Sequence, residues 1–233
     1  MIRQFAKVAG LAVTVACWVW AANGQRSEAW NVALIWCAPL LTFPITLLGR
    51  KALDARLGVR RAEWVNVAVH YAMMIALGVG IFPGFRLLMK QPVVATPVLA
   101  QLVAAVVVLT GIATFLTVLN LAWRGLGAPF AVKLSSRLAT DWMYGWTRNP
   151  MLICTLAWFL SLALWHQLAW GVLWIAASVA PGWIFFVKFY EERELEIRFG
   201  ASYAEYRART PFLWPRKPRP AEQQPAGLTR RGD

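Results

Sequence analysis

Acidic residues gather where the longest uncharged stretch of the chain ends. The stretch runs from residue 149 to 187, and the segment behind it carries four carboxylates: Glu191, Glu192, Glu194 and Glu196. Carboxylates beside an apolar, membrane-crossing stretch are costly unless a cation meets them. The cluster therefore predicts a site that binds a positively charged group.

Aromatic and cationic residues flank this cluster. Phe199, Tyr203 and Tyr206 recur at the spacing of one helix face, and Thr210-Pro211 ends the pattern. We expect this helix to cover the site. On the other side of the uncharged stretch stands Arg148, whose guanidinium can bind a carboxylate through two parallel hydrogen bonds.

The composition is that of a polytopic membrane protein. Hydrophobic residues make up 59% of the 233 residues and charged residues only 15%, against about half and a quarter in soluble domains. The net charge of +13 is spread over short segments between apolar runs, which argues against a nucleic-acid partner. The sequence contains no phosphate-binding glycine motif. Cys17, Cys37 and Cys154 lie inside apolar runs without metal-ligand spacing, so we expect packing roles and no metal.

The apolar runs predict an all-α bundle of about five to six transmembrane helices with a cytoplasmic C-terminal helix. The runs cover residues 8–25, 30–49, 64–85, 91–123 and 149–187, and in the fourth run Thr96-Pro97 predicts that the helix starts at residue 97. The last run is too long for one span, so we divide it into a helical hairpin that turns near His166-Gln167. We expect three parts: N-terminal helices over 1–90, a core with its closing hairpin and C-terminal helix over 91–215, and a disordered basic tail over 216–233.

The distribution of basic residues predicts the orientation. With six spans and a cytoplasmic N-terminus, the outer segments hold only Arg26, Arg86 and Lys90 of the 24 Lys and Arg residues. Such a split fits the positive-inside rule. It places both termini and both charged segments of the candidate site in the cytoplasm, and we expect an integral protein of a bacterial inner membrane.

Two paired motifs resemble the integral-membrane methyltransferases, which include isoprenylcysteine carboxyl methyltransferases and phospholipid N-methyltransferases. The first motif is Arg148-Asn149-Pro150-Met151, and the second is Glu191-Glu192 followed by Phe199-Gly200, Tyr203 and Tyr206. Gly127-Ala128-Pro129 is similar to a further family segment. The chain departs from the family pattern at Leu152, Cys154 and the segment 142–145.

This resemblance implies a methyl transfer from S-adenosylmethionine to a lipid or other membrane-partitioning acceptor at the cytoplasmic face. Arg148 and Glu192 would be the catalytic pair. Carried over position by position, the cofactor-binding residues would be Arg148, Asn149, Pro150, Met151, Glu191, Glu192, Tyr203, Tyr206 and Arg207. Arg148 and Asn149 can reach the carboxylate of the cofactor, and Glu191 or Glu192 its ammonium.

Other interpretations stay open at this point. Arg148 could be a positive-inside anchor, Tyr203 and Tyr206 could only pack, and Glu194 and Glu196 are better explained by pairing with Arg193 and Arg198. We expect His70 to be a hydrogen-bonded interior residue, so no histidine is placed to remove a proton. An NADPH-dependent sterol or steroid reductase and a non-enzymatic scaffold or transporter are the alternative functions. The acceptor and the oligomeric state stay open.

Overall fold

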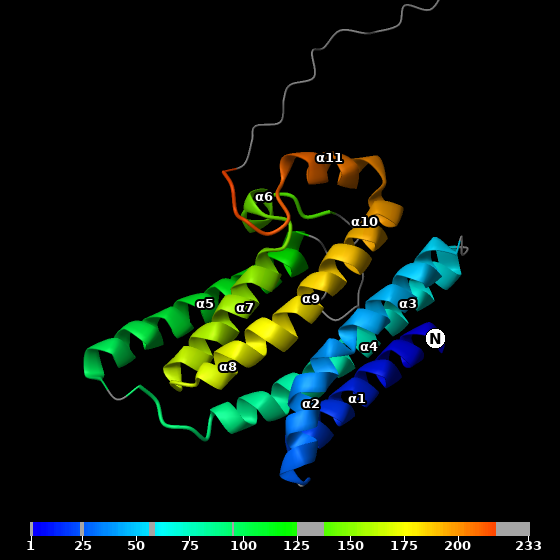
Figure 1. The fold of residues 1–233 in the computed structure, drawn as a ribbon. Helices are drawn as coiled ribbons and strands as arrows, with labels where there is room; N and C mark the ends of the chain where they lie inside the picture. The colour runs from blue at the N-terminus through cyan, green and yellow to red at the C-terminus, as the bar shows by residue number, and fades with distance from the viewer. Residues whose placement is uncertain (1, 24–25, 56–58, 95, 125–137, 218–233) are drawn as a thin grey trace, which may run out of the picture.

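A computed structural model describes residues 2–23, 26–55, 59–94, 96–124 and 138–217, and every regular element in these ranges is a helix (Figure 1). The N-terminal half contains α1 (Ile2–Asn23), α2 (Glu28–Leu40), α3 (Thr42–Asp54) and α4 (Val59–Leu88). The C-terminal half contains α5 (Pro97–Arg124), α6 (Met143–Trp146), α7 (Pro150–Trp165), α8 (Ala169–Trp174), the π-helical η1 (Ile175–Val179), α9 (Ala180–Phe186), the π-helical η2 (Val187–Glu191), α10 (Glu192–Phe199) and α11 (Ala201–Arg209).

The expected all-α membrane bundle is confirmed. Within the described ranges, five helices are long and apolar enough to cross a membrane: Ala6–Asn23, Glu28–Asp54, Arg61–Leu88, Pro97–Trp123 and Ala169–Phe199. The chain is therefore an integral membrane protein. The sixth apolar helix, α7, has only 16 residues, about 24 Å at 1.5 Å per residue, against a hydrocarbon core of about 30 Å.

Prolines act differently in the second and third apolar runs. Pro39 lies in the last turn of α2, and the helix direction changes at Leu41 before α3 begins. The hydroxyl of Thr42 donates to the Pro39 carbonyl at 2.6 Å, at the point where the two helices meet. Pro83, by contrast, lies inside α4 without ending it. The third run thus forms a longer helix than the predicted 64–85.

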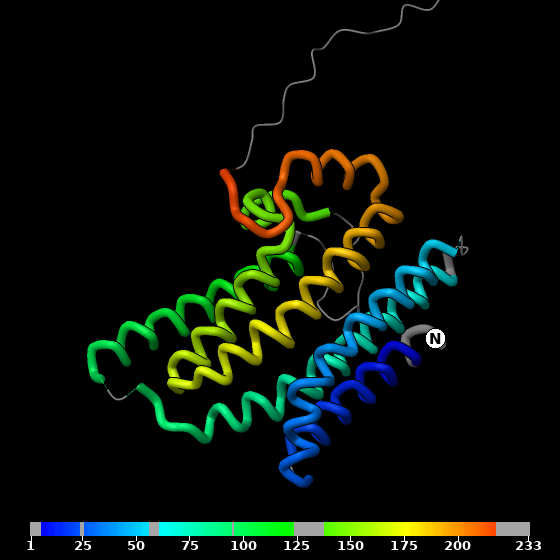
Figure 2. Tube along the Cα trace, in the orientation of Figure 1, coloured from blue at the N-terminus to red at the C-terminus, as the bar shows by residue number. Residues whose placement is uncertain are grey.

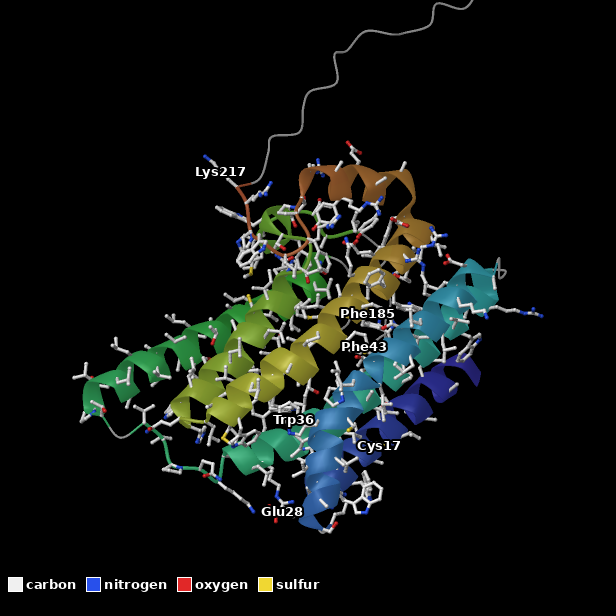
Figure 3. All side chains as sticks on the ribbon, in the orientation of Figure 1. Cys17, Glu28, Trp36, Phe43, Phe185 and Lys217 are labelled. Atoms are coloured by element: carbon white, nitrogen blue, oxygen red, sulfur yellow. The ribbon has the colours of Figure 1, made fainter. Side chains whose placement is uncertain are left out.

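The two halves pack along the helix that runs from Ala169 to Phe199. Figures 1 and 2 show α8 and α9 lying between α7 on one side and the pair α2–α3 on the other. Trp174 is fully buried, and its indole donates to the Ile35 carbonyl at 2.8 Å. A Cβ on Gly84 of α4 would lie 2.4 Å from the Trp174 ring, so only glycine allows this approach. Phe185 of α9 meets Phe43 of α3 at a centroid distance of 4.9 Å (Figure 3).

The closing hairpin turns where the sequence predicts it. α7 ends at Trp165, and Gln167 adopts a positive φ of 53° before α8 begins. His166 Nδ1 lies 2.9 Å from the Gln91 carbonyl, and the Gln167 amide donates to the Val93 carbonyl at 3.0 Å. These contacts fasten the turn to the segment that precedes α5. The hairpin brings the beginning of α7 beside the end of the Ala169–Phe199 helix.

Polar side chains concentrate at one end of the bundle. Figure 3 shows nitrogen and oxygen atoms gathered around α10, α11 and the end of α3, whereas the helix sides carry mainly carbon. We call this the polar end, defined by α6, α10, α11 and the last turn of α3. The expected domain boundaries at residues 90 and 215 stay predictions, and the tail from 218 onward lies outside the described residues.

Candidate functional site

Backbone contacts fix the start of α7 against the segment that follows α11. Asn149 precedes the helix with φ −130°, and Pro150 fills the first position, where a missing N–H costs nothing. The Arg148 N–H donates to the Pro211 carbonyl at 2.9 Å, and the Asn149 amide donates to the Phe212 carbonyl at 3.0 Å. The Thr147 hydroxyl donates to the same Phe212 carbonyl at 3.0 Å. The two ends of the candidate site are thus tied together through the main chain.

Arg148 and Glu192 form a buried ion pair. Arg148 Nη2 lies 2.8 Å from Glu192 Oε1, and the two side chains are only 7% and 8% exposed. Lys188 supplies a second cation, with Nζ 2.9 Å from Glu192 Oε2, and is 43% exposed. Removing one partner of a buried pair costs about 3–5 kcal/mol, because the other charge is left without compensation. The structure therefore brings together the two residues that the sequence places on opposite sides of the hairpin.

The Arg148 guanidinium keeps unused hydrogen-bonding capacity. Its Nε is buried and has no hydrogen-bond partner in the described part of the chain, and Nη1 reaches only the Arg207 carbonyl, at 3.5 Å. A buried donor without an acceptor costs about 1–3 kcal/mol. Such a donor at the wall of a cavity is suited to an anionic ligand group.

Two tyrosines of α11 cover the ion pair. Gly200 turns the chain between α10 and α11 at φ 53° and ψ −124°, a conformation that glycine adopts without strain. Tyr203 and Tyr206 are 1% and 2% exposed. The Tyr206 hydroxyl donates to the Tyr144 carbonyl at 2.7 Å, which anchors α11 to α6.

The tyrosine hydroxyls stay neutral at physiological pH. Burial raises the pKa of Tyr203, and the negative charge of Glu192 adds to the effect. Burial also raises the pKa of Tyr206 and of Tyr144. The three side chains therefore offer aromatic faces and neutral hydroxyls rather than phenolate bases.

Glu191 faces a different partner. Its Oε1 lies 3.6 Å from His70 Nε2, while His70 Nδ1 lies 2.8 Å from the Asn66 carbonyl. His70 is hydrogen-bonded inside the bundle, as expected. It also stands beside Glu191, a candidate site residue. The sequence carried no sign of this contact, because α4 is distant in sequence from both motifs.

The remaining acids form an ion-pair network outside this site. Glu194 pairs with Arg198, and Glu196 pairs with both Arg193 and Arg207. Arg193 also reaches Asp54 at the end of α3, with Nε 2.7 Å from Oδ1. These contacts match the interpretation of Glu194 and Glu196 as structural. Arg207 belongs to this network through its side chain and contacts Arg148 only through its carbonyl.

A cavity of about 80 Å³ lies between the ion pair and the α11 tyrosines. Six of the nine side chains selected from the sequence line it: Arg148, Asn149, Glu191, Glu192, Tyr203 and Tyr206. Tyr144, Val187, Leu195 and Phe199 complete the wall with Leu121, Leu138 and Ala139. Pro150, Met151 and Arg207 are not part of it. Gly127-Ala128-Pro129 lies outside the described residues.

Sequence reasoning missed several contributors. Tyr144 was noted only as part of a departure from the family pattern, and Phe212 was not selected at all. Phe212 lies under two cations, with its ring centroid 4.7 Å from Lys188 Nζ and 5.8 Å from Arg148 Cζ. Its position next to the closing Pro211 was the available signal. Among the described residues, no group of three or more His, Cys, Asp or Glu side chains is placed to hold a metal ion.

Comparison with known proteins supports the resemblance over part of the chain. The chain gives no match among curated proteins and none among solved structures. The family model described as phospholipid methyltransferase matches residues 99–202. This range contains most of α5, the Arg148 motif, the closing hairpin and the acidic pair, and it ends just before Tyr203. The predicted resemblance is thereby confirmed: residues 99–202 are similar to the phospholipid methyltransferases, a family of membrane methyltransferases related to the isoprenylcysteine carboxyl methyltransferases.

Proposed function

We propose that the protein transfers a methyl group from S-adenosylmethionine to a lipid or another membrane-partitioning acceptor at the cytoplasmic face. The observation that carries the proposal is the buried Arg148–Glu192 pair, which lies within the segment that matches the family and beside a tyrosine-walled cavity. The cofactor supplies an electrophilic methyl group on a cationic sulfur. The chain would have to bind, orient and desolvate the reactants.

The side chains present fit the amino-acid end of this cofactor. Arg148 offers a buried Nε without a partner to the cofactor carboxylate, and Asn149 lines the same wall. Glu192 offers its carboxylate to the ammonium, and the half-exposed Lys188 can give way to it. The faces of Tyr203 and Tyr206 would stabilise the sulfonium by about 0.5–2 kcal/mol.

The size of the cavity limits which part of the cofactor these residues surround. A volume of about 80 Å³ holds several water-sized groups, whereas pockets for drug-sized ligands measure about 300–1,000 Å³. The described residues would therefore enclose the amino-acid and sulfonium region. At this end of the cofactor, the alignment of the methyl group with the acceptor and the exclusion of water control the rate. Methyl transfer needs this alignment and no covalent nucleophile on the protein.

The proposed orientation draws support from the basic residues. Arg50, Arg193 and Arg207 belong to the polar end, whereas Arg26 and Arg86 lie where α1 and α4 reach the opposite end. Basic residues favour the cytoplasmic side. The polar end would thus face the cytoplasm, as in a bacterial inner membrane, and the acceptor would enter from the lipid.

Binding of S-adenosylhomocysteine tests the function. We expect Glu192→Gln and Arg148→Lys each to weaken calorimetric affinity about 10- to 100-fold, the equivalent of a charged hydrogen bond worth about 1.5–3 kcal/mol. Arg193→Lys and Glu196→Gln are the matched controls, because they alter the same residue types at the same end of the bundle but outside the cavity.

Two outcomes would contradict the proposal. One is an unchanged affinity in both cavity variants, with melting temperatures that show them to be folded. The other is thermal stabilisation by NADPH without stabilisation by S-adenosylmethionine, which would point to a reductase.

A further inference from the structure

We propose that Glu191 and His70 act together as the acceptor of the proton that the substrate loses on methylation, so that the substrate is a membrane-partitioning amine or thiol. This inference rests on the proposed function and goes beyond it in assigning a role to α4, which the family match does not reach. Glu191 would be the catalytic residue, since it lines the cavity. His70 would be a positioning residue that acts through Glu191.

The geometry of the pair defines where a proton can reside. A carbonyl only accepts hydrogen bonds, so the 2.8 Å contact with Asn66 O assigns a hydrogen to His70 Nδ1. Nε2 is then left to face Glu191 Oε1 at 3.6 Å. If the ring is neutral, the lone pair of Nε2 points at the carboxylate, and the two electron-rich groups repel each other. One additional proton, on Nε2 or on Glu191, removes this repulsion. The pair therefore gains from taking up a single proton.

The other groups that line the cavity are unsuited to this task. Glu192 already pairs with two cations, Arg148 and Lys188, through its two carboxylate oxygens. The three tyrosines keep their protons, since burial raises the pKa of each phenol. Two carboxylates, Glu191 and Glu192, belong to the described wall of the cavity. The closest partner of Glu192 is an arginine, whereas that of Glu191 is His70, a side chain that can gain and lose a proton near neutral pH.

The surroundings of His70 hold the ring in place and balance the nearby charges. Asn66, only 2% exposed, donates to Glu194 Oε1 at 3.2 Å and accepts from the Tyr190 hydroxyl at 3.1 Å. The rings of Phe186 and Tyr190 lie edge-on to the imidazole. Of the charged groups that face His70 from η2 and α10, Glu194 is already paired with Arg198. Glu191 gains an equivalent partner only when His70 is protonated.

The reaction step balances with this assignment. A bond forms between the acceptor nitrogen or sulfur and the methyl carbon, while the bond from that carbon to the sulfonium sulfur breaks and its electron pair stays on sulfur. The acceptor hydrogen leaves as a proton to the Glu191 carboxylate. His70 Nε2, which faces that carboxylate at 3.6 Å, stabilises the proton there until Glu191, whose side chain is 35% exposed, releases it to water, which restores the pair for the next turnover.

Single-turnover methylation of two probes tests the assignment. Dodecylamine and dodecanethiol in detergent micelles would be incubated with deuteromethyl-labelled S-adenosylmethionine between about pH 5.5 and 9, with product measured by mass spectrometry. For His70→Asn we expect a rate at least about 10-fold below wild type at pH 7. We also expect the loss of the inflection in the wild-type pH profile, with S-adenosylhomocysteine affinity within twofold of wild type. Glu191→Gln should give the same loss of rate.

His166→Asn is the matched control. His166 also places Nδ1 against a carbonyl, that of Gln91 at 2.9 Å, but at the turn of the hairpin. It should retain the wild-type rate and pH profile. The proposal is overturned if His70→Asn keeps that profile, if His166→Asn loses it equally, or if His70→Asn loses cofactor affinity in parallel with rate.

Wild-type behaviour separates this inference from the proposed function. If wild type binds S-adenosylhomocysteine but methylates neither probe, the amine or thiol assignment is wrong and the methyltransferase proposal stands. If wild type does not bind it, the proposed function fails first.

Discussion

At the scale of single residues, the site is defined by which charges are already compensated. Glu192 has two cationic partners, Glu194 and Glu196 have arginines, and Glu191 has a histidine. The four carboxylates of this short segment are all glutamates, but each has a different set of charged partners. Their differences come from α4 and from the start of α7, two parts of the chain that local reasoning cannot bring together.

The buried tyrosines predict an alkaline limit to stability. Because burial raises the pKa of Tyr203 and Tyr206, the folded protein retains protons that the unfolded chain releases above about pH 10. Their contribution to the free energy of unfolding is fully present below pH 10. It falls above that pH by about 1.4 kcal/mol per pH unit for each tyrosine.

Thermal unfolding in detergent between pH 8 and 12 measures this effect. The melting temperature of wild type should fall more steeply above pH 10 than that of Tyr203→Phe, which has no proton to lose at this position. Equal slopes in the two proteins would show that Tyr203 titrates in the folded state much as in the unfolded chain.

At the scale of elements, the turn at Gly200 determines whether α11 reaches the site. A Cβ at this position meets nothing within 4 Å, so a substitution to alanine would add backbone strain without a clash. We expect Gly200→Ala to cost about 1–3 kcal/mol locally. Because α11 packs through Tyr206 onto α6, the strain should appear as about a 5- to 100-fold weaker binding of S-adenosylhomocysteine.

The melting temperature distinguishes a local effect of Gly200→Ala on α11 from unfolding of the whole bundle. The melting temperature of the bundle should change little in Gly200→Ala, and Ala204→Gly on the same helix serves as the control for altered helix propensity. Wild-type affinity in Gly200→Ala, or a loss of affinity matched by unfolding of the whole protein, would refute the role assigned to this turn.

The elements themselves were largely predictable, and their contacts were not. Apolar runs located every long helix, and His166-Gln167 marked the hairpin turn, because both signals are local. The extension of α3 to Asp54 and of α4 to Val59 was missed, since charged helix ends resemble loops by composition. The contact between His70 and Glu191 depends on how α4 lies against η2, which no pattern within either element encodes. The roles of the nine selected site residues remain predictions.

At the scale of the whole molecule, the polar end gives a testable orientation. In a variant without Cys17, Cys37 and Cys154, we expect Arg216→Cys to be protected from a membrane-impermeant maleimide in intact cells and labelled after lysis. Lys90→Cys, at the opposite end of the bundle and exposed, should be labelled in intact cells. The reverse pattern would place the site on the outer face and contradict the positive-inside assignment.

The 16-residue length of α7 has a consequence for the surrounding bilayer. A helix about 6 Å shorter than the hydrocarbon core favours local thinning of the membrane on its lipid-facing side. Arg148 lies two residues before the start of this helix, so the depression would form beside the ion pair. The headgroups of nearby lipids would then lie closer to the level of the cavity. An amphiphilic acceptor would have a shorter distance to move out of the bilayer before its reactive group reaches the cavity.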